Sequence, residues 1–124
     1  MILNILKSKI HRVTVTEADL HYVGSITIDE DLMEAAHLVE YEKVQILNIT
    51  NGNRLDTYAI KGKRGSGCIK INGAAAHHVN ISDLIIIVSY CQLNANDVDT
   101  HEPRIVHVNS KNEIISITAN EITA

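Results

Sequence analysis

Three short segments of the sequence collect side chains that could carry out chemistry. They span residues 11–29, 48–60 and 71–77. In the second segment, Arg54 offers a planar guanidinium that can hold a carboxylate through two parallel hydrogen bonds, and Tyr58 offers a phenol that can exchange a proton. Side chains four residues apart lie on one face of a β-strand. A strand here would therefore present Arg54 and Tyr58 together, with Thr57 on the other face.

The third segment is rich in small residues. Gly73, Ala74 and Ala75 directly follow Asn72. Small side chains let backbone N–H groups approach a ligand closely, so this run could line a binding site. A tightly packed helix start is the alternative interpretation of the alanines.

The elements that would position these segments are mostly strands. Alternating and β-branched runs predict strands at residues 10–16, 25–28, 44–50, 53–60, 69–72 and 84–90. Asn51-Gly52 predicts a hairpin turn, because both residues accept positive φ. Asp29 is a typical N-cap for a short helix, and residues 73–78 predict a short helical turn. Beyond Leu93 the signal weakens.

A weak internal repeat relates two parts of this pattern. Ala-Ala-His at residues 35–37 recurs at 75–77, and two later aliphatic positions match at the same offset of 40 residues. Each copy predicts a strand, a short helix and a strand. Chance is one explanation; the other is a pair of like units around a pseudo-two-fold axis. Short strands with an aliphatic interior then suggest a small closed barrel.

The composition agrees with a mainly β chain of one domain. The 124 residues are 45% apolar and include 19 isoleucines, but no Phe and no Trp. A core of β-branched aliphatic side chains favours strands over helices. A chain of this length corresponds to a single domain.

Charge and motif content argue against several classes of protein. The net charge is −4 and the basic residues are scattered, so no nucleic-acid partner is expected. The longest apolar run, residues 84–88, is too short to span a membrane, and the N-terminal segment lacks a signal-peptide pattern; we therefore expect a cytoplasmic protein. Cys68 and Cys91 have no metal or redox spacing, and the histidines form no credible metal site.

The three segments together resemble a known family, the aspartate 1-decarboxylases of the pantothenate pathway. The resemblance covers about the first 90 residues. It is carried by Lys9, His11-Arg-Val, Ala18-Asp-Leu, Tyr22, Gly24-Ser25, Asn51-Gly52, Arg54, Thr57-Tyr58 and residues 72–77. No single motif suffices, since the pair Gly65-Ser66 repeats Gly24-Ser25 without the surrounding residues.

The resemblance implies a fold, an assembly and a maturation step. Members fold as a six-stranded double-psi β-barrel with short helices and assemble as homotetramers. They also cut their own chain at a bond that matches Gly24-Ser25. We therefore expect one domain over residues 1–124, cut into a β chain of residues 1–24 and an α chain of residues 25–124, with four copies of each in the tetramer.

The implied cofactor is a pyruvoyl group made from Ser25, which forms a Schiff base with L-aspartate. Such a group is needed because loss of CO₂ from an amino acid leaves a carbanion at Cα, and ordinary side chains cannot take up its electron pair. Pyridoxal phosphate can, but it needs a phosphate cradle that this sequence does not show, so neither pyridoxal phosphate nor a metal is expected. Gly24 has no Cβ, which leaves room for a distorted peptide when the Ser25 hydroxyl attacks its carbonyl.

The resemblance also assigns roles to individual side chains. Tyr58 matches the proton donor, and Thr57 matches a substrate-binding residue that also stabilises the oxyanion during cleavage. Arg54 and Lys9 match residues that hold a substrate carboxylate. The remaining matches are the substrate loop Gly73, Ala74 and Ala75 and the supporting residues His11, Tyr22 and Asn72.

Two other functions remain open at this stage. One is a non-catalytic β-barrel module that binds another molecule, which would not need Lys9, Arg54 and Tyr58. The other is a pyruvoyl enzyme for a different amino acid such as glutamate, because the two cations favour an acidic side chain without fixing its length. The sequence departs from the family at Ser82, where many members have Gly, and beyond Leu93.

Overall fold

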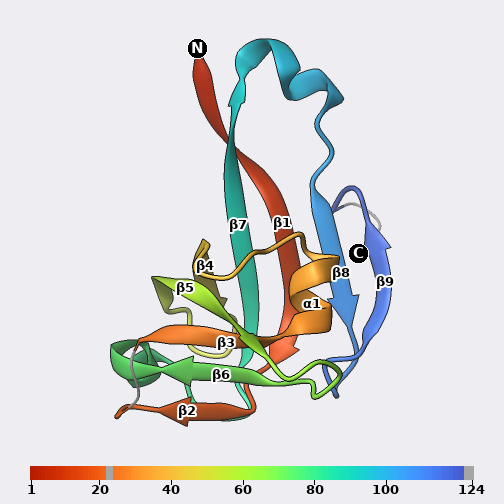
Figure 1. The fold of residues 1–124 in the computed structure, drawn as a ribbon. Coiled ribbons are helices and arrows are strands. Elements are labelled where there is room, and N and C mark those ends of the chain that lie inside the picture. Colours follow the sequence, from red (N-terminus) through yellow and green to blue (C-terminus); the bar gives the residue numbers. More distant parts are fainter. Residues whose placement is uncertain (22–23, 122–124) are drawn as a thin grey trace.

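The computed structural model describes residues 1–21 and 24–121 and is mainly β, as expected (Figure 1). Its strands are β1 (Ile2–Thr14), β2 (Glu17–Asp19), β3 (Ser25–Asp29), β4 (Lys43–Asn48), β5 (Arg54–Gly62), β6 (Ile69–Asn72), β7 (Leu84–Asn94), β8 (Arg104–Val108) and β9 (Ile114–Thr118). Its helices are α1 (Glu30–Ala35) and the 3₁₀ helices η1 (Gly73–His78) and η2 (Ala95–Thr100). No helix in these residues is long and apolar enough to cross a bilayer.

The expected count of six strands is wrong, because the described residues form nine. β2 is only three residues long, too short to produce a periodic signal. β8 and β9 come from the segment beyond Leu93, where the sequence pattern is weak. Four of the five residues of β9 are exposed, so this edge strand has no buried face and no alternation of apolar and polar residues.

The strands form one curled, mixed sheet in the order β2-β6-β3-β5-β4-β7-β1-β8-β9. Three pairs are parallel: β1 with β8, β2 with β6, and β3 with β5. Strand β5 changes partner along its length. It pairs with β4 as far as Tyr58 and with β3 from Ala59 onward. This change brings the start of β3 next to the middle of β5.

The predicted repeat has a structural counterpart. The first unit is β3-α1-β4 and the second is β6-η1-β7. Corresponding strands of the two units pair with each other, since β3 lies antiparallel to β6 and β4 lies antiparallel to β7. This arrangement is that of two like units related by a pseudo-two-fold axis.

The turns that lead into β4 and β7 repeat even the backbone hydrogen bonds. The N–H of Tyr41 donates to the carbonyl of Ala59 (2.7 Å), and the N–H of Ala59 donates to the carbonyl of the residue after Tyr41 (2.9 Å). The N–H of Ser82 donates to Val15 (2.8 Å), and Val15 donates to the residue after Ser82 (2.9 Å). Both turn residues have positive φ, 72° at Tyr41 and 76° at Ser82.

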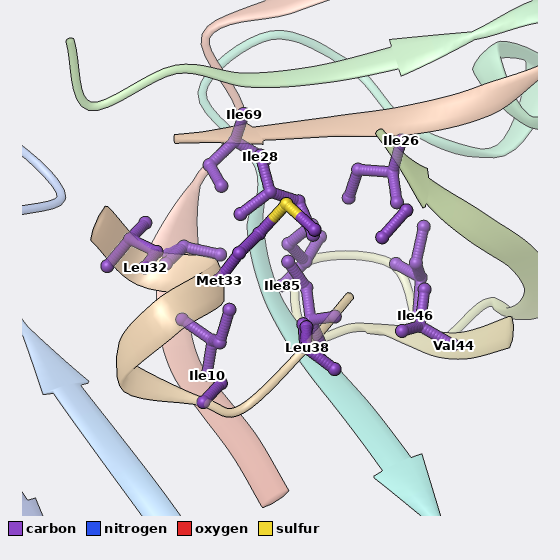
Figure 2. Packing of buried hydrophobic residues seen from close by; sticks show 14 of the residues in the cluster. Ile10, Ile26, Ile28, Leu32, Met33, Leu38, Val44, Ile46, Ile69 and Ile85 are labelled. Atoms are coloured by element: carbon purple, nitrogen blue, oxygen red, sulfur yellow. The ribbon is translucent and has the colours of Figure 1, made fainter. Parts of the chain in front are cut away.

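The core lies between the sheet and α1 and is built from aliphatic side chains (Figure 2). Helix α1 begins where predicted, because the Asp29 carboxylate accepts the N–H of Asp31 at 2.8 Å. The helix then turns Leu32 and Met33 inward, and Met33 lies close to Ile28 of β3. Complete burial of each such side chain contributes about 2 kcal/mol.

The hairpin between β4 and β5 is looser than the sequence predicts. Strands β4 and β5 pair antiparallel, as expected, but residues 49–53 form a five-residue connection. Gly52 has a φ of 79°, whereas Asn51 is not among the residues with positive φ. The N–H of Gly52 donates to the Asn48 carbonyl at 2.8 Å. The carbonyl and the side chain of Asn48 therefore accept hydrogen bonds from within this loop. The loop is longer than the two-residue turn that the sequence predicts.

The turn between β8 and β9 is joined to the rest of the molecule through the buried side chain of Asn112. The Asn112 amide accepts the N–H of Thr14 and donates to the carbonyls of Thr14 and Gly67, each at 2.8 Å. Asn112 is buried and has a φ of 61°. The turn between β8 and β9 therefore fastens the end of β1 to the loop that precedes β6.

Candidate active site

Ser25 is a buried polar residue at the start of β3. Its side chain is only 2% exposed, whereas Gly24 is exposed. Ser25 has a φ of 131°, a region that L residues rarely adopt and that costs about 1–3 kcal/mol. The Gly24–Ser25 peptide bond thus directly precedes β3, and the first residue of that strand is strained.

Tyr58 contacts the carbonyl of the same peptide bond. Its hydroxyl donates to the Gly24 carbonyl oxygen at 3.0 Å. The residue sits at the point where β5 leaves β4 for β3, since Tyr58 lies opposite Lys43 and the next residue lies opposite Ile26. A phenol at this distance can stabilise negative charge that develops on the carbonyl oxygen if the carbon is attacked.

Asn72 lies opposite Ser25 in the antiparallel pairing of β3 with β6. Its Nδ2 donates to the Ser25 Oγ at 3.0 Å and to the Thr27 Oγ1 at 3.1 Å. Asn72 is completely buried, and its Oδ1 has no hydrogen-bond partner among the described residues. The reversed amide would instead leave two donors unmatched, so this orientation is the less costly one.

Four of the predicted site residues therefore form one cluster: Gly24, Ser25, Tyr58 and Asn72. The predicted small residues come directly after it, because Gly73 begins η1. Gly73 is buried with a φ of 69°, Ala75 is half-buried against the core, and Ala74 is exposed. The positive φ explains why glycine stands at this position.

Arg54 and Thr57 are on the same strand as Tyr58, but they are placed differently. Arg54 is exposed at the start of β5, about 13 Å along the strand from Tyr58, and it has no ion pair or hydrogen bond within residues 1–21 and 24–121. Its guanidinium is therefore available to an anion. Thr57 is half-buried opposite Val44. In this structure, the side chain that donates to the Gly24 carbonyl is Tyr58 and not Thr57.

Lys9 and His11 lie on β1, which is separated from β5 by β4 and β7 in the sheet. The Lys9 ammonium forms an ion pair with Glu121. The His11 ring meets His107 of β8 edge-on, with centroids 5.8 Å apart. Burial, together with the neighbouring His107, lowers the pKa of His11. The structure does not bring these two residues into the Ser25 cluster, and Tyr22 lies outside the described residues.

Two residues near the cluster were not identified from the sequence. Thr27 shares the Asn72 amide with Ser25, and the ring of Tyr41 packs on Tyr58 with centroids 6.4 Å apart. The alternation of β3 could have shown Thr27 on the same face as Ser25. Nothing in the sequence near Tyr41 indicates a contact across 17 residues. In the part of the chain that is described, no group of three or more His, Cys, Asp or Glu is arranged to bind a metal.

Comparison with known proteins gives a consistent result over nearly the whole chain. Residues 1–115 match the model of the family described as aspartate decarboxylase. A protein of Acetivibrio thermocellus named aspartate 1-decarboxylase is 58% identical over 121 residues, which cover 98% of this chain and 96% of that protein. The proteins of the same name from Caldicellulosiruptor saccharolyticus and Clostridium kluyveri are 57% and 54% identical, each over 98% of this chain and over 94% and 95% of their own lengths.

Proposed function

The chain belongs to the aspartate decarboxylase family, and on that premise we propose that it converts L-aspartate into β-alanine and CO₂ for pantothenate synthesis. Its relatives cover nearly the full chain at more than half identity, and their name, aspartate 1-decarboxylase, gives both the reaction and the substrate. Arg54 is exposed and has no ion pair among the described residues, which supports a substrate that carries a second carboxylate.

The chain first cleaves itself between Gly24 and Ser25. The Ser25 Oγ attacks the Gly24 carbonyl carbon and replaces the amide by an ester. Elimination then frees the Gly24 carboxylate and leaves dehydroalanine, and one water releases ammonia to give a pyruvoyl group on residues 25–124. The single observation that carries this proposal is the Tyr58 hydroxyl, 3.0 Å from the oxygen on which charge develops in the first step.

The surroundings of Ser25 fit a pyruvoyl group at this position. The residue is buried and strained, so cleavage relieves a backbone conformation that is unfavourable in the intact chain. Asn72 donates to the Ser25 Oγ and leaves that hydroxyl's own proton free to move.

In turnover, the residues of the chain bind substrate and move a proton. When present, the pyruvoyl group supplies a carbonyl that takes up the electrons released as CO₂ leaves. Arg54 holds the carboxylate that is retained, and the backbone at Gly73, Ala74 and Ala75, with Thr57, completes the substrate site. Lys9 is not in the Ser25 cluster of its own chain, so its assistance to Arg54 would come from a neighbouring copy in the proposed tetramer. Tyr58 returns a proton to the carbon that has lost CO₂.

We infer a double-psi β-barrel and a homotetramer of four α and four β chains. The repeated units and their matching turns support the barrel. Exposed aliphatic and aromatic side chains such as Ile2, Ile81 and Tyr90 support burial against other copies. A native mass of about four times the 13.7 kDa chain tests the assembly. The cytoplasm is the compartment that suits a biosynthetic step of this kind.

Intact-mass spectrometry of the purified protein tests the proposed function. We expect two pieces, residues 1–24 and 25–124, with a ketone at the N-terminus of the larger piece that blocks Edman degradation. Borohydride should abolish the release of β-alanine from aspartate. An active protein with an uncut chain would refute the maturation, and faster turnover of glutamate than of aspartate would refute the substrate. Cleaved protein that turns over neither amino acid would favour a different activity.

A further inference from the structure

Tyr41 is an exposed aromatic residue with an unfavourable backbone conformation. Its side chain is 72% exposed and its φ is 72°. Glycine and asparagine adopt positive φ easily, whereas a bulky residue does so only under constraint. The fold of the single chain gains little apolar burial from this ring, so burial within the chain does not account for a tyrosine at a position that favours glycine.

The contact that the ring does make is with Tyr58. The two rings are tilted by 40° to each other, and their centroids are 6.4 Å apart, a distance within the range of favourable aromatic pairs. Tyr58 is the residue whose hydroxyl reaches the Gly24 carbonyl. A side chain that restricts the Tyr58 ring therefore also restricts the position of this hydroxyl.

The backbone around Tyr41 holds this contact in place. The N–H of Tyr41 donates to the carbonyl of Ala59, the residue directly after Tyr58, at 2.7 Å. Ala59 in turn donates to the carbonyl of Glu42 at 2.9 Å. The Glu42 carboxylate binds Lys7 and the N–H of Val39, so the turn is fixed at both ends. The two residues are thus connected through a short hydrogen-bonded backbone path as well as through their ring contact.

The equivalent turn at Ser82 separates the needs of the fold from those of the site. Its φ is 76°, and its two backbone hydrogen bonds to Val15 repeat those of Tyr41 with Ala59. A serine suffices there, which indicates that this turn does not require a large side chain. The same turn conformation therefore occurs at Tyr41 and at Ser82, and the aromatic ring is present in the first turn alone.

We propose that Tyr41 is a positioning residue that keeps the Tyr58 hydroxyl on the Gly24 carbonyl before cleavage and at the reacting carbon during turnover. This inference rests on the proposed function, because it assigns Tyr41 a role through Tyr58. The ring itself provides the restraint, and the Tyr41 hydroxyl takes no part.

Three variants test this role: Tyr41→Gly, Tyr41→Phe and the matched control Ser82→Gly. For Tyr41→Gly we expect precursor cleavage and kcat to fall about 3- to 10-fold, the loss of one aromatic contact, with KM nearly unchanged. Its melting temperature should not fall, since glycine accepts the positive φ. Tyr41→Phe and Ser82→Gly should cleave and turn over at the wild-type rate.

Each contrary result overturns the inference. Full rates in Tyr41→Gly would show that Tyr58 needs no support from this ring. Slow rates in Tyr41→Phe would transfer the role to the hydroxyl, and equally slow rates in Ser82→Gly would reveal a general effect of the turns. If the wild-type chain neither cleaves nor decarboxylates aspartate, the proposed function fails instead, which is a separate result seen before any variant is made.

Discussion

The two repeated units of this molecule have the same layout but contribute differently to the candidate site. The first, β3-α1-β4, carries Ser25, and the second, β6-η1-β7, carries Asn72 directly opposite it. In the proposed maturation, the first therefore supplies the group that reacts, and the second supplies the amide that is hydrogen-bonded to it. Two units with the same backbone layout thus carry different side chains at one pair of facing positions, Ser25 and Asn72, for which we propose different roles.

The same division appears in the turns before β4 and β7. Tyr41 and Ser82 share a positive φ and a pattern of hydrogen bonds, yet only Tyr41 contacts the site. The comparison shows that the backbone conformation belongs to the fold, because it occurs in both units. The side chain placed on it is what differs with function.

The largest expected effect comes from removing the reacting hydroxyl of the first unit. Ser25→Ala should abolish both cleavage and decarboxylation, because no oxygen remains to form the ester. Mass spectrometry and a β-alanine assay measure the two outcomes. Ser66→Ala is the matched control, since Ser66 follows a glycine in an exposed loop; if cleavage depended on Ser66 instead, the assignment of Ser25 would be wrong.

The next effect tests whether Arg54, on the strand that follows the first unit, anchors the substrate. Arg54→Lys should leave cleavage intact but lower kcat/KM for aspartate roughly 30- to 1000-fold, or about 2–4 kcal/mol, because a point charge does not restrain the carboxylate as a bidentate fork does. Arg64→Lys is the control, as Arg64 pairs with acidic residues of α1 at the surface. An unchanged kcat/KM in Arg54→Lys would place the anchor elsewhere.

Removing the supporting amide of the second unit should have an intermediate effect. Asn72→Ala is expected to slow cleavage about 10-fold, and to lower the free energy of unfolding by about 1–3 kcal/mol, because the buried Ser25 hydroxyl and the half-buried Thr27 hydroxyl lose a donor. Cleavage time courses and urea unfolding measure these changes. Thr27→Val removes the neighbouring hydroxyl alone and should cleave normally; if it cleaves as slowly as Asn72→Ala, then Asn72 acts by packing and not through Ser25.

A small stabilisation should follow from relieving the turn that has no role in the site. Ser82→Gly should raise the free energy of unfolding by about 0.5–1 kcal/mol, since relief of the positive φ exceeds the added entropy of the unfolded chain. Urea unfolding of the uncut Ser25→Ala background gives this value without interference from cleavage. A loss of stability would mean that the Ser82 side chain makes an essential contact.

The smallest effect is a pH dependence on β1, outside both units. Burial and the positive charges of His107, Arg12 and Lys9 lower the pKa of His11, opposed by Glu121. The folded protein therefore binds a proton at His11 less readily than the unfolded chain. Stability from this source is complete above about pH 6.5 and is lost as the pH falls through the lower folded pKa.

Melting temperatures of His11→Gln and of wild type at several pH values from 8 to 5 check this dependence. The variant should lose less stability on acidification than wild type does. His21→Gln, an exposed histidine in the same N-terminal region, should behave as wild type. A wild-type slope in His11→Gln would contradict the assignment.

The sequence predicted the local features that depend on a few neighbouring residues. Strand β3, the cap of α1 at Asp29 and the helical turn after Asn72 were all expected, because an N-cap, a β-branched run or a positive-φ glycine acts over a short range. It also located the repeat, although not the partners of its strands. The double-psi topology and the tetramer stay proposals.

The features that were not predicted depend on contacts distant in sequence. Asn112 joins Thr14 across 98 residues, and Tyr41 meets Tyr58 across a hairpin; neither produces a periodic pattern. The five-residue loop at Asn51-Gly52 was mispredicted because Asn48 organises it from outside the turn. The positions of Lys9 and His11, three strands from Tyr58, likewise follow from sheet order, which local signals do not contain.

The location of β1 has a consequence for how the protein could refold after the proposed cleavage. Strand β1 lies between β7 and β8 and buries Ile10 and Val13, so under the proposed maturation the piece that carries β1 would stay paired in the sheet after the Gly24–Ser25 bond is cut. The intact precursor would then fold as one molecule, whereas the mature form would have to reassemble from two separate chains. Refolding of the mature form would depend on concentration, because the connection that made folding unimolecular would be gone. Efficient folding would thus be confined to the uncut precursor.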